Sequence, residues 1–107
     1  MALIAELEFD LSSSDKKMSL RIFQPMRNPD LEAWTCAFEI DDPLGVRREI
    51  HGESSFQALI LSLKTASAYL YGSELYKSGQ IGIYGNFGGN LILPATELFL
   101  EAAPYPF

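Results

Sequence analysis

The residues that could do chemistry in this 107-residue chain are few, and the clearest are its single histidine and its single cysteine. A catalytic dyad or a metal site at His51 would need a thiol or further ligands converging on the imidazole. The one available thiol, Cys36, alternates with Trp34 and Phe38 on one face of a predicted strand. A cysteine in such a position is typical of a small buried hydrophobe, and buried cysteines are usually inert. The sequence thus assigns no catalytic residue, metal ligand or cofactor; it leaves enzymatic activity open and favours its absence.

Two further patterns could do chemistry, a pair of alternating acids and a glycine-rich loop. Glu6 and Glu8 alternate along a predicted strand, whereas acid–base catalysis needs two carboxyls facing across a cleft in unequal environments. Alternating acids more simply mark a solvent-facing side. A phosphate-binding glycine loop opens a helix, but the loop at 85–90 is followed by an apolar run that predicts a strand. We interpret the loop as the tip of a hairpin.

Composition limits the classes of protein that this chain can represent. It carries 14 acidic against 8 basic residues, a net charge of −6, which is the opposite sign to that needed for phosphate contacts. We therefore expect no nucleic-acid partner. A single cysteine, with no signal peptide and no long apolar run, predicts a cytoplasmic protein without membrane contact. The length fits one domain over residues 1–107.

The hydrophobic periodicity divides the chain into a strand-forming half and a helix. Period-two alternation predicts four strands, at about 3–10, 18–24, 33–41 and 46–51. Ser54 and Gln57 form a capping-box pattern, so a helix is expected from about 55 to 71. The tail from 77 predicts short pieces of strand, with a helical turn after Pro94. The expected fold class is α+β: a four-stranded, mainly antiparallel meander, then one long helix packed on the sheet, then this tail.

The predicted helix is apolar on nearly all sides. One stripe is expected to pack on the sheet and consists of Phe56, Leu59, Ile60, Leu63, Ala66, Ser67 and Leu70. The opposite side carries Ala58, Leu61, Thr65, Ala68, Tyr69, Gly72 and Tyr76. A helix that is apolar all round is buried on more than one side. The tail is the expected main cover, and dimerisation is a second contributor.

Two kinds of function remain after these exclusions. The first is a non-catalytic protein-interaction module that self-associates as a homodimer or binds a partner protein, with candidate interface residues Phe23, Leu61, Tyr69 and Tyr76. The second is a small-ligand-binding protein or minor enzyme with a pocket between the helix and the C-terminal tail. His51 and Tyr84 are its candidate ligand contacts.

A resemblance to a family of small bacterial proteins of unknown function is carried by two stretches, Trp34-x-Cys36-x-Phe38-x-Ile40 and Gly52-x-Ser54-Ser55-x-Gln57-Ala58-Leu59-x-Leu61-x-Leu63. It covers about half of the chain, and it implies a sheet followed by a helix without implying an activity. The order of strands and helix, with Ser-x-x-x-Ala-Leu opening the helix, is also similar to HicB-type antitoxins. That resemblance implies binding to a toxin and a DNA-binding segment, and no such segment is recognisable in this chain.

Overall fold

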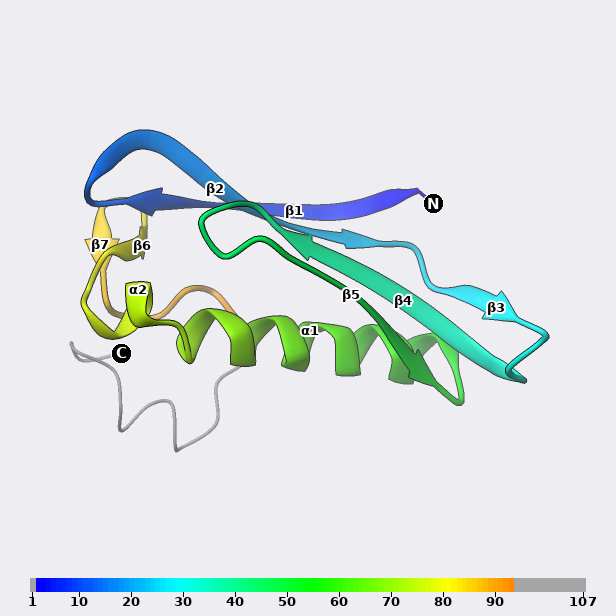
Figure 1. Cartoon of the computed structure of the whole chain (residues 1–107). Helices are drawn as coiled ribbons and strands as arrows, with labels where there is room; N and C mark the ends of the chain where they lie inside the picture. Colours follow the sequence, from blue (N-terminus) through cyan, green and yellow to red (C-terminus); the bar gives the residue numbers. More distant parts are fainter. Residues whose placement is uncertain (1, 94–107) are drawn as a thin grey trace.

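The computed structural model describes residues 2–93, which form seven strands and two helices (Figure 1). Their bounds are β1 Leu3–Leu11, β2 Ser14–Phe23, β3 Met26–Asn28, β4 Ala33–Ile40, β5 Val46–Gly52, α1 Ser55–Tyr71, α2 Glu74–Lys77, β6 Ile81–Ile83 and β7 Asn86–Phe87. Neither helix of this part of the chain is long and apolar enough to cross a membrane.

All seven strands join one antiparallel sheet, so the predicted four-stranded meander is wrong. The sheet runs β3-β4-β2-β1-β6-β7, and β5 pairs with the other side of β4. The difference has two causes. Pro25 separates β2 from the short strand β3, which pairs with the start of β4. The segment expected to lie on the helix instead supplies β6, which pairs with Asp10 and Leu11 at the end of β1.

The strand registers give the sheet one apolar and one charged face. In the β1–β2 pair Glu6 lies opposite Arg21, and Glu8 lies opposite Ser19. Because alternate residues point to opposite faces, the residues between them point toward the core. That core-facing set includes Phe9, Met18, Leu20, Ile22, Cys36, Phe38 and Ile40, each at most 3% exposed.

Helix α1 packs on β4 and β5 along the core face of the sheet (Figure 1). Its N-cap is as predicted: the Ser54 hydroxyl accepts a 3.0 Å hydrogen bond from the Gln57 N–H. The predicted sheet-facing stripe is wrong at its start, because Phe56 is 72% exposed whereas Ala58 is fully buried. A Cβ added to Gly52 would lie 2.5 Å from the Ala58 nitrogen. The helix therefore meets the sheet through small residues, which permit an approach too close for Phe.

The described part of the tail is tied to the end of α1 by two buried tyrosines. The Tyr71 hydroxyl accepts a hydrogen bond from Leu91 N–H at 3.0 Å and donates one to Leu93 O at 3.1 Å. The Tyr76 hydroxyl donates to Gly89 O at 3.0 Å, and the two rings meet edge to face at 4.9 Å. Up to residue 93 the tail thus packs against the end of α1 and against α2, and Lys64 and Ala68 in the C-terminal half of α1 stay exposed. The predicted helical turn after Pro94 falls outside the described residues.

Candidate functional site

The two residues predicted to contact a ligand are not brought together. His51 is exposed near the end of β5, and its Nδ1 lies 2.9 Å from the Thr35 hydroxyl. Tyr84 is 88% exposed and lies in the turn between β6 and β7. These two places are at opposite ends of the molecule (Figure 1). A pocket that uses both side chains would need a different fold.

The four predicted interface residues lie in four different environments. Leu61 is 37% exposed on α1, and Phe23 is half-buried at the end of β2. Tyr69 is half-buried, and its ring lies 5.9 Å from the Arg48 guanidinium carbon. Tyr76 is fully buried, with its pKa raised to about 12 by desolvation, so it belongs to the core and offers nothing to a partner. These residues do not form one surface.

The sulfur and the imidazole considered for catalysis lie on opposite faces of the sheet. Cys36 is fully buried, and its Sγ lies 3.3 Å from the Phe23 carbonyl oxygen. Burial raises the pKa of the Cys36 thiol, which disfavours the thiolate that a nucleophile requires. His51 pairs in register with Thr35, the residue before Cys36, and therefore faces the other way. Among residues 2–93 no group of three His, Cys, Asp or Glu side chains could hold a metal ion.

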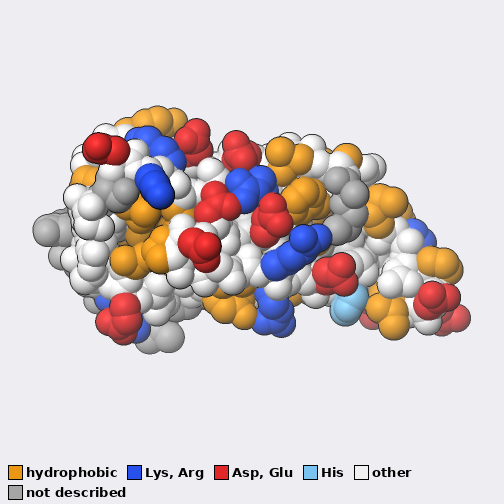
Figure 2. All heavy atoms as spheres, turned by 45° about the horizontal axis from the view of Figure 1, so that its top comes forward, with side chains coloured by type: hydrophobic (Ala, Val, Ile, Leu, Met, Phe, Trp, Pro, Cys, Tyr) orange, Lys and Arg blue, Asp and Glu red, His pale blue; other side chains and the backbone are white. Residues whose placement is uncertain are grey.

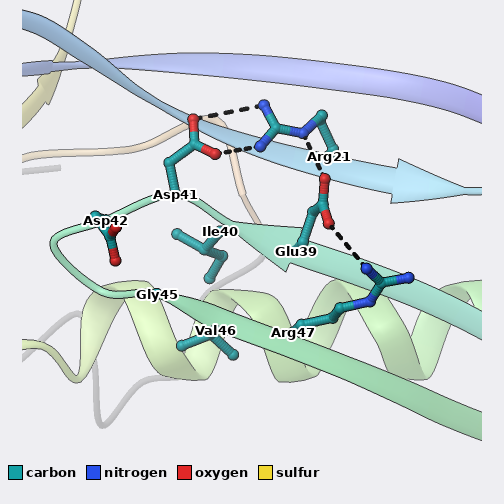
Figure 3. A pocket seen from close by; sticks show the side chains of 8 residues that line it. All are labelled: Arg21, Glu39, Ile40, Asp41, Asp42, Gly45, Val46 and Arg47. Atoms are coloured by element: carbon teal, nitrogen blue, oxygen red, sulfur yellow. Dashed lines mark hydrogen bonds and ion pairs between the residues drawn. The ribbon is translucent and has the colours of Figure 1, made fainter.

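Charged side chains gather over the middle of the face opposite α1 (Figure 2). At their centre Arg21 donates to Glu39 at 2.8 Å through Nε, to Asp41, and to Glu6 at 3.3 Å through one terminal nitrogen. Arg47 completes the network with a 3.8 Å ion pair to Glu39 (Figure 3). Glu6 lies on β1, Arg21 on β2 and Glu39 on β4, and Asp41 directly follows β4. The network therefore joins three neighbouring strands.

The open hollow beside this network has a volume of about 290 Å³ and is lined by Arg21, Glu39, Ile40, Asp41, Asp42, Gly45, Val46 and Arg47 (Figure 3). The Arg21 guanidinium lowers the pKa of Asp41, and that carboxylate raises the pKa of Arg21 in turn. A carboxyl with a lowered pKa holds no proton to give near neutral pH, so Asp41 is unsuited to general acid catalysis. Arg21, Glu39, Asp41 and Arg47 are joined by ion pairs, and we interpret this network as structural. Asp42, which also lines the hollow, forms no ion pair among the described residues.

The other notable surface is the outer edge of β1, over residues 3–9. β2 pairs with one side of this segment, whereas β6 reaches only Asp10 and Leu11 on the other side. Among the described residues no strand pairs with the outer side of 3–9, which we call the open edge. Leu3 and Ile4 at its start are 50% and 49% exposed. An unpaired edge presents a row of free N–H and C=O groups that can accept another strand.

An apolar cleft lies directly beside the open edge, on the core side of the sheet. Its volume is about 170 Å³, and its lining is Ala5, Glu6, Leu7, Leu20, Ile22, Leu63 and Leu93. It exists because α1 lies under β4 and β5 and leaves the core face of β1 partly uncovered. Leu63 from the helix and Leu93 from the tail form its far wall. The cleft and the open edge share Ala5, Glu6 and Leu7, so a segment bound along the edge would place side chains in the cleft.

Sequence reasoning identified the alternation of residues 3–10 but not its role. The signal was available in part, because Leu3 and Ile4 are adjacent apolar residues on opposite faces of a strand that starts the chain. A half-buried strand needs only one apolar face. Which strand becomes an edge depends on pairing with distant segments, and the alternation of one strand does not contain that information.

Comparison with known proteins gives a family and no further relative. The matching family model is described as a domain of unknown function, DUF6968, and it covers residues 5–95. No curated protein and no solved structure matches the chain. The resemblance to a family of unknown function is therefore confirmed, and nothing in these comparisons points to antitoxins. The match covers the open edge from residue 5 onward, the cleft and both helices, and the chain belongs to this DUF6968 family of domains of unknown function.

Proposed function

We propose that the protein is a non-catalytic protein-interaction module that binds an extended segment of a partner along the open edge of β1. The observation that carries this proposal is the outer side of residues 3–9, which no strand within residues 2–93 pairs with, next to an apolar cleft. In strand addition, main-chain hydrogen bonds supply affinity and pockets for alternate side chains supply specificity. Natural proteins usually block a long apolar edge with charges, prolines or a covering element. Here the start of the edge, Leu3 to Ala5, is apolar and exposed, and exposed acids follow at Glu6 and Glu8.

The cleft supports recognition of side chains better than binding of a small molecule. Its volume of about 170 Å³ lies below the roughly 300 Å³ at which ligand pockets usually begin. Its lining is almost wholly apolar, because the one ionisable residue beside it, Glu6, turns its carboxylate to Arg21 on the other face of the sheet. Ligand sites instead place several polar groups to fix orientation. A space of this size suits one or two apolar side chains that arrive on every second residue of a strand.

A strand-forming peptide tests this proposal directly. The probe is a ten-residue peptide of alternating valine and threonine, blocked at both ends, titrated into the protein while backbone amide shifts are followed by NMR. We expect saturable shifts in β1 and at the cleft. Ala5→Leu fills the cleft entrance at an exposed position and should weaken binding, whereas Ala68→Leu makes the same change on the exposed side of α1 and should not.

The proposal fails if no strand-forming peptide perturbs β1, or if Ala5→Leu and Ala68→Leu bind with equal affinity. Self-association, which the sequence predicts, remains a separate prediction. The helix supports it less than expected, because Tyr76 is buried and Tyr69 is half-buried.

A further inference from the structure

One of the three acids of β1 lies opposite an uncharged residue of β2. Arg21 lies opposite Glu6 and Lys17 lies opposite Asp10, and each of these pairs forms a salt bridge. Glu8 lies between the two acids but faces the uncharged Ser19. It is exposed and forms no salt bridge among the described residues.

β2 shows what chemistry β1 accepts along its length. It presents Met18, Leu20 and Ile22 to the core face and Lys17 and Arg21 to the acids. A strand on the open edge meets the same two faces of β1 from the other side. Its residues on the core side would enter the apolar cleft, and its residues on the charged side would meet Glu8 and Glu6. Because Glu6 already contacts Arg21, Glu8 has the greater capacity to pair with a new cation.

We propose that the open edge binds an extended partner segment in which apolar residues alternate with lysine or arginine, and that Glu8 forms an ion pair with one of these basic side chains. This inference rests on the proposed function and names its partner class. A second copy of the chain fits less well, because pairing β1 with β1 brings acids to the edge from both sides. The net charge of −6 further favours a basic partner.

The test compares three blocked ten-residue peptides in which valine alternates with lysine, threonine or glutamate. Dissociation constants are measured by NMR titration at low salt with the full-length protein. The lysine peptide should bind best and the glutamate peptide worst. Glu8→Gln should weaken binding of the lysine peptide about 1.4- to fivefold, the range expected for one exposed ion pair. Its affinity for the threonine peptide should equal that of the wild type.

Glu49→Gln is the matched control, because this exposed acid lies on the same face of the sheet at the opposite edge. It removes the same charge far from the open edge, so any effect of net charge alone would appear in this variant as well. We expect its affinity for the lysine peptide to equal that of the wild type. Equal loss in the two variants would overturn the role of Glu8. Equal affinity for the lysine and threonine peptides would overturn the charge preference and leave the proposed function intact.

Two further outcomes show which molecule, if any, binds the open edge. Absence of binding by all three peptides would remove both the inference and the proposed function. Shifts in β1 that grow with protein concentration alone, without peptide, would show that a second copy takes the edge and would overturn the assigned partner.

Discussion

At the scale of single residues, Arg21 is the side chain on which the charged face depends. Its guanidinium contacts carboxylates from three positions, on β1, on β4 and directly after β4. A planar guanidinium has five donors in a fixed fork, which a lysine ammonium cannot reproduce. The contacts serve packing of strands, since every carboxylate involved belongs to a neighbouring segment of the sheet.

The lowered pKa of Asp41 predicts how stability depends on pH. A carboxyl whose pKa falls on folding stabilises the folded state above its ordinary pKa, and this stabilisation is lost as the pH falls through the lower, folded value. We expect Asp41→Asn to lower the melting temperature at pH 7 and the difference from wild type to shrink as the pH falls below the ordinary pKa of an aspartate. Melting curves over this pH range measure it. A difference that does not change with pH would contradict the assignment.

The buried hydroxyl of Tyr71 predicts a second effect at this scale. Tyr71→Phe leaves the Leu91 N–H and the Leu93 carbonyl without this partner inside the protein. Unsatisfied buried groups of this kind cost about 1–3 kcal/mol in unfolding free energy. Urea unfolding measures the loss, and Tyr84→Phe is the control because that side chain is 88% exposed. Equal stability of the two variants would show that the hydroxyl does not hold the tail.

At the scale of elements, the sequence predicts segments better than their arrangement. The helix expected at 55–71 and the strand expected at 33–41 lie where local periodicity and capping place them. The order of the strands in the sheet cannot be predicted from local periodicity, because the pairing of β6 with β1 joins residues about seventy positions apart. The prediction of the sheet-facing side of the helix is wrong at Phe56 for a related reason. Hydrophobicity favours Phe56 in the core, but the sheet accepts the small residues Ala58 and Ser62.

The same limit applies to the candidate site. Alternation identifies the two faces of residues 3–10, so the acids and the apolar side chains of β1 could be predicted. The open edge could not, since it exists only because β6 is short and pairs at one end. The cleft could not be predicted either, because it depends on where α1 ends up under the sheet.

The close contact between α1 and β5 predicts a packing effect. Gly52→Ala would place a methyl group 2.5 Å from the Ala58 nitrogen, and this distance can grow only if the start of the helix moves. Overpacking of this kind costs about 1–3 kcal/mol. Urea unfolding is the measurement, and Glu53→Ala, at the next and exposed position, is the control. Unchanged stability of Gly52→Ala would contradict the packing of α1 through small residues.

At the scale of the whole molecule, two surfaces could join copies of the chain, and they make different predictions. Self-association through α1, predicted from the sequence, would be lost in Leu61→Ser and kept in Ala5→Leu. Self-pairing at the open edge would show the reverse pattern. Light scattering at tens of micromolar distinguishes them, and a wild-type monomer would remove both without affecting the binding of a partner segment.

The central claim is that the outer side of residues 3–9 receives a strand, and amide hydrogen exchange tests it most directly. In the free protein the β1 amides that point away from β2 should exchange quickly. With the valine–lysine peptide bound, protection should appear at every second residue of this segment, because only alternate amides face the new strand. Protection confined to α1 or β5, or a uniform change along β1, would contradict the account.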